Sequence, residues 1–294
     1  MPSLIDIRRR IRSVKNTQQI TKAMKMVSAA KLRRAQERAL ASRPYANMMA
    51  RVLANLAAAS QNNESVSDLP LLQSREEKRI QLIVVSSDRG LAGAFNSNLL
   101  RMVQRFIEEH RGAEIQVETI GRKARDYFRK RNYNVTGEHI GAVERPSYEL
   151  AREIGDKLIR LYRNSEVDAV YIASNHFKNV MSPNLVLSKI LPVEMPEAEK
   201  QQDNNPPQAL DYIFEQPVEE LLRALLPRYV EMEIYRTMLE SNSAEHAARM
   251  TAMDTATNNA GDVIQNLTLN MNRVRQASIT REIIEIVSGA AALS

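Results

Sequence analysis

The segment RMTAMDTATNNAGDVIQNLTLNMNRVR, residues 249–275, decides the fold of this chain. Apolar or small side chains recur in it at alternating spacings of three and four residues, the pattern by which helices pair in a coiled coil. The positions are Met250, Met253, Thr257, Ala260, Ile264, Leu267, Met271 and Val274. Around them, residues 228–288 contain no proline and one glycine, Gly261. At 1.5 Å per residue this predicts a helix roughly 90 Å long, which we expect to end at Gly289.

A second long helix is predicted near the N-terminus, because residues 3–43 contain neither glycine nor proline. Ser3 can cap it, and a carboxylate three residues later suits its first turn. Apolar residues form a narrow seam whose second half is out of phase by one residue. The seam positions are Ile7, Ile11 and Val14, then Ile20, Met24 and Val27. Pro44 should kink or end the helix, and residues 45–59 are still helical in pattern.

The two ends of the chain carry opposite charge. Residues 1–44 hold 12 Lys or Arg and two acids, a net charge of +10, whereas residues 217–294 hold seven Arg and ten acids, a net charge of −3. The opposite signs favour pairing of the two terminal helices, although several shorter bundle helices are an alternative. The basic end predicts an acidic partner, and nucleic acid, an acidic lipid surface and an acidic protein surface all fit.

Between the terminal helices the hydrophobic period changes. Residues 79–87, RIQLIVVSS, are a β-branched apolar run typical of a buried strand. The further expected strands are 114–120, 133–135, 167–173, 184–193 and 210–214, and the expected helices are 91–110, 122–130 and 147–163. This alternation predicts a largely parallel sheet covered on both faces, with the last two strands added antiparallel. Residues 196–207 are poor in apolar side chains and are expected to form a mobile loop.

The predicted fold class is therefore α/β: a long antiparallel coiled coil of the N- and C-terminal helices plus a Rossmann-like α/β domain with a mostly parallel sheet. The expected boundaries are an N-terminal coiled-coil helix over 1–60, a linker over 61–78, the α/β domain over 79–215, and a C-terminal coiled-coil helix over 216–294. Pro217 suits the first turn of that last helix, and Pro227 should kink it.

The sequence offers no catalytic residue, metal site or cofactor site that we would defend. Cysteine is absent, which excludes a disulfide, a thiolate metal site and a cysteine nucleophile. The four histidines, His110, His139, His176 and His246, show no metal-ligand spacing. The adjacent acids at 108–109 and 219–220 face different directions on their helices, as solvated surface residues do.

The turn DRGLAGAFN, residues 88–96, follows a buried strand and opens a helix, where a nucleotide-binding turn would lie. It lacks both GxGxxG and GxxxxGK[ST], so a tight strand-to-helix turn is the simpler interpretation. Ser86 and Ser87 lack the GxSxG context of a nucleophile elbow. A nucleotide-binding α/β protein stays open as an alternative.

A basic coiled-coil nucleic-acid binder is the other alternative, because the N-terminal helix carries ten Lys or Arg between residues 8 and 34. No aromatic side chain interleaves them. No apolar run approaches the roughly 20 residues that span a bilayer, and the N-terminus lacks the apolar region of a signal peptide. We therefore expect a cytoplasmic chain that reaches a membrane only through a partner.

Three segments resemble the gamma subunits of bacterial-type F-type ATP synthases. The first is NTQQITKAMKMV, residues 16–27, followed by KL at 31–32 and SRPY at 42–45. The second is SDRGLAG, residues 87–93, and the third is RQASITRE, residues 275–282, followed by EIVSGAA at 285–291. Their order and spacing span the chain.

This resemblance implies a non-catalytic rotor. The coiled coil would be the central shaft inside a ring of α and β subunits, and the α/β domain would contact the epsilon subunit and the membrane c-ring. Proton flow would turn the ring and the shaft, and ATP would be made in the β subunits. It implies one copy per complex, no cofactor, no nucleic acid, and a peripheral position at the cytoplasmic face of the cell's inner membrane.

The resemblance also implies which residues couple the rotor to its surroundings. The contacts would be made by Met24, Lys25, Arg275, Gln276, Thr280 and Glu282. The basic residues facing acidic loops of the β subunits would be Arg9, Arg12, Lys22, Lys31, Arg33 and Arg34. Two positions depart from the family pattern: Ala92, where many relatives have cysteine, and Pro227, where many lack proline.

Overall fold

A computed structural model describes residues 3–59, 69–177, 184–194 and 216–293. The chain divides into two compact units. Unit 1 comprises Met1–Ala29 and Arg249–Ser294, and unit 2 comprises Ala30–Ala248. The predicted loop 196–207 and the predicted strand 210–214 lie outside the described residues.

Two long helices supply segments to both units: α1, Leu4–Ala59, and α6, Val218–Leu293. Ser3 begins α1 as predicted, because its hydroxyl accepts from the backbone N–H of Asp6 while the Asp6 carboxylate accepts from the backbone N–H of Ser3, both at 3.3 Å. Pro44 does not end α1, which continues for fifteen residues beyond it.

Gly289 does not end α6, contrary to expectation, since the helix continues to Leu293. Glycine permits a helix end without enforcing one, and here it is followed by three alanines, the residue type with the highest helix propensity. Pro227 likewise lies within the continuous helix.

Unit 2 contains a five-stranded sheet in the order β3-β2-β1-β4-β5. The strands are β1, Arg79–Val85; β2, Glu114–Ile120; β3, Val135–His139; β4, Ala169–His176; and β5, Asn184–Leu191. β1 pairs in parallel with β2 and β4, β2 pairs in parallel with β3, and β5 is antiparallel to β4. The prediction of a mostly parallel sheet with an antiparallel addition is therefore confirmed.

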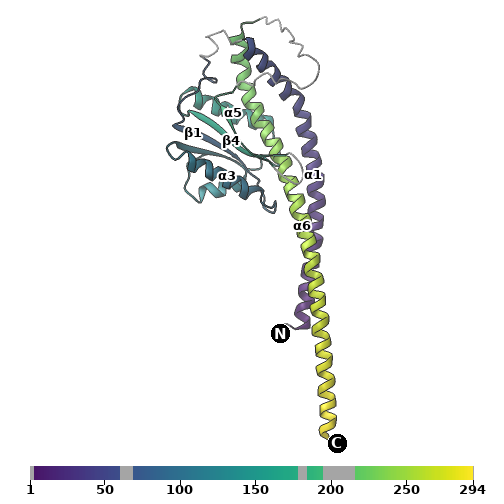
Figure 1. The fold of residues 1–294 in the computed structure, drawn as a ribbon. Coiled ribbons are helices and arrows are strands. Elements are labelled where there is room, and N and C mark those ends of the chain that lie inside the picture. Colours follow the sequence, from purple (N-terminus) through teal and green to yellow (C-terminus); the bar gives the residue numbers. More distant parts are fainter. Residues whose placement is uncertain (1–2, 60–68, 178–183, 195–215, 294) are drawn as a thin grey trace. The chain divides into compact units, whose positions relative to one another are not determined.

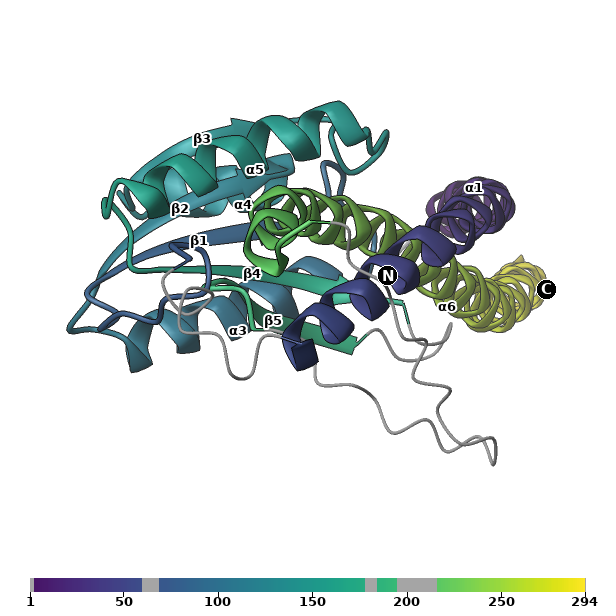
Figure 2. The ribbon, with the colours of Figure 1, turned by 90° about the horizontal axis from the view of Figure 1, so that it is seen from above.

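Helices cover both faces of this sheet: α3, Phe95–Glu109; α4, Arg122–Arg129; and α5, Tyr148–Arg163. Figure 2 shows α3 and α5 on opposite sides of it. The alternating side chains of β1 divide between two cores. Leu82 and Val84 pack with α3 and α4, whereas Ile83 and Val85 pack with α5 and the first turns of α6. Because β1 is buried on both faces, its sequence is apolar without alternation from Leu82 to Val85, and the amide of the buried Gln81 donates to the Thr136 hydroxyl at 2.9 Å.

The helix predicted over 91–110 begins four residues later than expected. Leu91 and Gly93 have φ values of 63° and 56°, a left-handed backbone that an α-helix cannot contain. The chain therefore makes a tight turn after β1 before α3 starts at Phe95.

Residues 69–78, the described part of the predicted linker, lie against the sheet domain. Leu69 and Leu71 are buried in the core, and the backbone N–H of Val193 donates to the carbonyl of Leu71 at 2.8 Å. Glu77 accepts from the Tyr171 hydroxyl at 2.9 and 3.0 Å. Among the described helices, none combines the length and the apolar character required to span a bilayer.

Candidate functional site

Unit 1 is an antiparallel pair formed by the start of α1 and the last half of α6 (Figure 1). Side chains fix its register through polar contacts. The hydroxyls of Thr21 and Thr257 lie 2.8 Å apart, and the Gln18 amide donates to the Thr257 carbonyl at 3.3 Å. One turn further along α1, the Lys25 ammonium donates to the Asp254 carboxylate at 2.5 Å. Rising numbers on α1 meet falling numbers on α6, so the predicted antiparallel coiled coil is confirmed.

The seam of α6 follows the predicted positions. Each of the eight residues from Met250 to Val274 is buried or half-buried, whereas most residues between them are exposed. Met253 and Ala260 are the most deeply buried of the set. The side chain of Gln18 lies 3.3 Å from where a Cβ at Gly261 would be, so this glycine allows close approach of α1.

The seam of α1 differs from the prediction in its second half. Ile20 and Val27 are 60% and 56% exposed, and Thr21 and Ser28 occupy the buried positions instead. The spacing thus continues in phase from Ile7 with polar residues in place of apolar ones. Thr21 can be buried at this position because its hydroxyl has a partner in Thr257. The spacing of apolar residues along one helix cannot reveal such a partner.

The coupling residues that the resemblance implied lie in two different settings within unit 1. Met24 is half-buried, and Lys25 is paired with Asp254. The others, Arg275, Gln276, Thr280 and Glu282, are exposed on the part of α6 that extends beyond the start of α1 (Figure 1). The structure therefore does not bring the two groups together.

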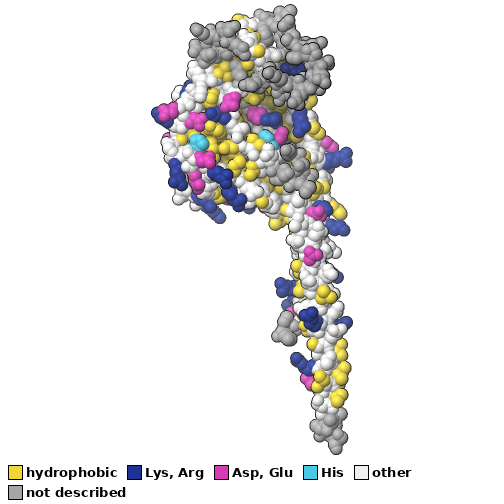
Figure 3. Space-filling view, in the orientation of Figure 1, with side chains coloured by type: hydrophobic (Ala, Val, Ile, Leu, Met, Phe, Trp, Pro, Cys, Tyr) yellow, Lys and Arg dark blue, Asp and Glu magenta, His cyan; other side chains and the backbone are white. Residues whose placement is uncertain are grey.

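An exposed apolar surface lies on the same end of α6, and sequence reasoning did not single it out. Its residues are Ile279, Ile283, Ile284, Ile286 and Val287. Figure 3 shows hydrophobic side chains along this end of the helix. The signal was present in the sequence, because Ile279, Ile283 and Ile286 are again spaced four and three residues apart, after a gap of five residues from Val274. Large apolar side chains gathered on an unpaired helix mark a surface that a partner covers.

The predicted basic residues of α1 divide between the units. Arg9, Arg12 and Lys22 are exposed in unit 1. In unit 2, Arg33 pairs with Glu37 at 3.2 Å, and Lys31 donates to Glu144 at 2.8 Å. Arg34 is exposed as well. The charge of Lys31 is therefore already directed to a carboxylate of the same chain.

The turn after β1 in unit 2 is the position where a nucleotide would bind in a dinucleotide-binding fold. The first amides of α4, at its N-terminus, already have partners inside the chain. The N–H of Arg122 donates to the Asp88 carboxylate at 3.0 Å, that of Lys123 to the Ser87 carbonyl at 3.1 Å, and that of Ala124 to the Ser86 hydroxyl at 2.8 Å.

These contacts occupy the N-terminus of α4, the helix that follows β2, so its first amides are not free for a phosphate beside the turn. A helix N-terminus binds phosphate through free amides and its positive dipole end. Here the Asp88 carboxylate holds that position, and its second oxygen accepts from the N–H of Gly141 at 3.0 Å. The protein's own carboxylate thus closes the N-terminus of α4, while α3, the helix that follows the turn, begins at Phe95 without a side-chain cap.

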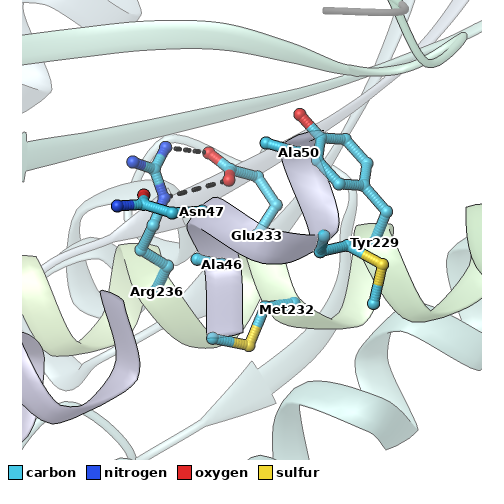
Figure 4. Close-up of a pocket in the computed structure, with 8 residues that line it drawn as sticks. Ala46, Asn47, Ala50, Tyr229, Met232, Glu233 and Arg236 are labelled. Atoms are coloured by element: carbon cyan, nitrogen blue, oxygen red, sulfur yellow. Dashed lines mark hydrogen bonds and ion pairs between the residues drawn. The ribbon is translucent and has the colours of Figure 1, made fainter. Parts of the chain in front are cut away.

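A small pocket on unit 2 lies between α1 and α6 (Figure 4). Its volume is about 140 Å³, below the roughly 300–1,000 Å³ of typical ligand sites. It is lined by Ala46, Asn47, Met49, Ala50, Tyr229, Met232, Glu233 and Arg236. The Arg236 guanidinium faces the Glu233 carboxylate at 2.5 Å, so its charge is compensated within the pocket wall. Within the described ranges, no cluster of three or more His, Asp or Glu is arranged to hold a metal ion.

Comparison with known proteins shows which family has this sequence and architecture. The family model described as ATP synthase matches residues 3–293. The chain is 61% identical to the ATP synthase gamma chain of Solibacter usitatus, over 99% of both chains, and 50% identical to that of Pelotomaculum thermopropionicum, over 100% of both.

A solved structure shares the fold at low sequence identity. The match is to a chain of the Euglena gracilis mitochondrial ATP synthase, with a TM-score of 0.68 and 19% identity over 99% of this chain and 94% of the other. With a paired-helix unit, a mostly parallel sheet and relatives named as gamma chains along its whole length, this chain belongs to the gamma chains of the ATP synthase family.

Proposed function

We propose that this chain, a non-catalytic gamma subunit, is the rotor shaft that couples proton-driven rotation of a membrane c-ring to ATP synthesis in the β subunits. The partners are the α and β subunits of the catalytic head, the epsilon subunit and the c-ring, with one copy of the chain per complex. The complex lies at the cytoplasmic face of the cell membrane, where the chain is peripheral.

The observation that carries this proposal is the unpaired end of α6. Its large apolar side chains, Ile283, Ile286 and Val287 among them, are exposed beyond the start of α1. A helix that leaves such residues in water is stable in a cell when another surface encloses it. A ring of subunits around a central axis provides this enclosure on all sides of the helix.

Polar contacts would transmit the motion. Arg275, Gln276, Thr280 and Glu282 are exposed beside the apolar surface, and Ser278 donates to Glu282 at 3.2 Å. Met24 and Lys25 are the corresponding contacts on the paired part of the shaft. The exposed basic residues of α1 would face acidic loops of the β subunits. Such charges set the approach and the register of the partners more than their affinity.

The test is assembly of the head. A tagged copy is coexpressed with candidate α and β subunits, and the purified material is examined for mass and ATPase activity. We expect a hexameric α–β complex that carries one copy of this chain, and an activity that the chain lacks alone. A free chain, or ATP turnover by the chain in isolation, would contradict the proposal.

Two variants locate the contact within the assembled complex. Ile283→Asn removes an apolar side chain from the exposed end of α6 and should lower the yield of complex. The matched control is Leu91→Asn, which removes a similarly exposed side chain from unit 2, at a left-handed position that asparagine tolerates. Equal yields from both variants would mean that the end of α6 is not enclosed.

The basic face is tested by the rate of assembly. A triple exchange of Arg9, Arg12 and Lys22 to glutamine should slow association with the head at low salt, and the difference should shrink as salt rises. A control of equal charge change replaces three exposed arginines on and beside α3, namely Arg101, Arg105 and Arg111. If both triple variants assemble equally fast, the partner is not steered by α1.

A further inference from the structure

The loop over residues 140–146, between β3 and α5, touches three other elements of unit 2. Its Glu144 carboxylate accepts from the Lys31 ammonium of α1 at 2.8 Å. The other carboxylate oxygen lies 3.4 Å from the Arg89 guanidinium, in the turn after β1. We call these three residues, Lys31, Arg89 and Glu144, the Glu144 node.

The carboxylate of this node is held in its charged form. The hydrogen bond from Lys31 is the largest cause that lowers the pKa of Glu144, and the Lys31 and Arg89 charges add to it, against the opposing effect of burial. The Glu144 side chain is 34% exposed and that of Lys31 is 40% exposed. The Lys31–Glu144 pair is thus partly shielded from solvent and is screened less by salt than a fully exposed pair, whereas the Arg89 side chain is 72% exposed.

The same loop also packs against α6 and forms a hydrogen bond with it. Val143 is completely buried, and the Asn242 side-chain amide donates to its carbonyl. Asn242 is itself buried, so a helix residue and a loop backbone group satisfy each other away from water. One side of the loop is therefore fixed to α1 and another to α6.

The turn after β1 completes the connection to the sheet. Asp88 accepts from the backbone of Gly141 in the loop, and Ala92 and Phe95 pack against Ala244 of α6. The segment SDRGLAG, residues 87–93, which resembles the family in the α/β region, thus has a structural role that does not involve a nucleotide. It joins the carboxyl end of β1 to the loop and to α6.

We propose that the Glu144 node is a positioning site that transmits torque between helix α1 and the sheet of unit 2. This inference rests on the proposed function, because it assigns a place where the rotor's helices are locked to its α/β domain. Apolar packing, such as that of the buried Leu32 on α1, keeps one face of a helix inside, but the hydrophobic effect itself has no direction. Charge-assisted hydrogen bonds at the helix periphery are directional and oppose turning of the helix about its own axis.

Hydrogen exchange in the assembled complex tests whether the Glu144 node holds the loop over residues 140–146 in place. Glu144→Gln should raise the exchange rate of the loop amides, such as that of Arg145, roughly five-fold, as expected for a partly exposed ion pair. Glu37→Gln, which removes the exposed Arg33–Glu37 pair on the same helix with the same change of charge, should leave the loop unchanged. Lys31→Gln should reproduce the effect, and Lys31→Arg should restore the wild-type rate.

The rotational stiffness of the complex tests whether the Glu144 node transmits torque. A node that only stabilised the fold would leave this stiffness unchanged. The chain has no cysteine, so Arg111→Cys provides one exposed attachment point for a bead on unit 2. With the head immobilised and rotation stalled, Glu144→Gln should widen the angular spread of the bead, and Glu37→Gln should not.

The outcomes separate this inference from the proposed function. A wild-type complex that fails to form or to rotate overturns the proposed function itself. A wild-type complex that rotates, with the same angular spread in Glu144→Gln and in Glu37→Gln, overturns the inference alone. If Glu144→Gln does not assemble, the comparison of Lys31→Gln with Lys31→Arg decides, and equal spread in those two variants overturns the inference.

Discussion

Replacing Thr21 with valine tests whether the polar contact in the seam of unit 1 matters more than its apolar character. Valine is the residue that coiled-coil rules favour at a seam position, so a reading of the seam by hydrophobicity alone predicts stabilisation. The structure predicts the opposite. Thr21 is buried, and its hydroxyl lies 2.8 Å from that of Thr257. A methyl group placed there would need roughly 3.5–4.0 Å from its nearest non-hydrogen neighbour.

The expected cost follows from two contributions. The lost hydrogen bond costs about 1 kcal/mol, and the crowding of a methyl group against the Thr257 hydroxyl costs about 1–3 kcal/mol. Together these give a loss of at least roughly 2 kcal/mol, or about thirty-fold faster local opening. Thr21→Ser keeps the hydroxyl and loses one methyl group, which costs at most about 0.8 kcal/mol, or about a four-fold change.

Hydrogen exchange of the full chain, followed on peptides that cover residues 14–28 and 253–261, measures this opening. Peptides from α3 in unit 2 serve as the internal reference. Thr257→Ala in the Thr21→Val background removes the crowding, so the double variant should be more stable than the sum of the single effects by more than the roughly 0.3–0.5 kcal/mol of ordinary non-additivity. If Thr21→Val exchanges as slowly as Thr21→Ser, the hydroxyl contact does not determine the seam.

Three further predictions concern unit 2. Burial alone would raise the pKa of Glu118, but the hydrogen bond from His139 and the Lys157 charge outweigh it and lower the pKa below 4.5. Its contribution to stability is thus present above pH 4.5 and lost as the pH falls below that value, so the stability advantage of wild type over Glu118→Gln in urea unfolding should shrink from pH 5 toward pH 3. Gly121→Ala should cost about 3 kcal/mol or more of unfolding free energy, because φ is +104° and a Cβ would lie 2.0 Å from the Ser86 carbonyl oxygen. Gly112→Ala, with open space around it, is the control and should unfold at the wild-type urea concentration. Ser147→Ala removes the N-cap of α5 and should lower the free energy of unfolding by about 1 kcal/mol, whereas Ser147→Asp should retain the cap and the stability.

Periodicity predicted those parts of the fold in which burial is simple. The α6 seam from Met250 to Val274 was found because each position faces the partner helix and little else. Strand β1 was found because burial on both faces gives it a continuous apolar run from Leu82 to Val85. Strand β2 was predicted with its observed bounds, Glu114–Ile120. The limits of β3 and of α3 were displaced by a few residues, since backbone turns such as the one at Leu91 depend on contacts that the local sequence does not encode.

The α1 seam and the setting of Lys31 could not be predicted in the same way. Thr21 and Ser28 are indistinguishable from surface residues until the opposing helix is in place. Lys31 belongs to a basic stretch, and only the folded chain shows that Glu144, 113 residues later, accepts from it. The exposed apolar end of α6 was visible in the sequence, but its significance depends on how far α1 extends alongside it.

The composition of unit 1 is consistent with a helix pair that must stay rigid while much of its surface faces outward. A wide apolar stripe would bury more surface, but it would also let the two helices slide by a heptad with little loss, because the hydrophobic effect has no direction. Thr21 against Thr257 and Lys25 against Asp254 allow one register only, at some cost in stability, as single polar residues do in coiled coils. The Glu144 node applies the same principle in unit 2, where Lys31 on α1 meets a carboxylate of the sheet domain. In both units directional contacts therefore add to apolar packing a preference for one register or one orientation of the helix, which a rotor requires to transmit rotation.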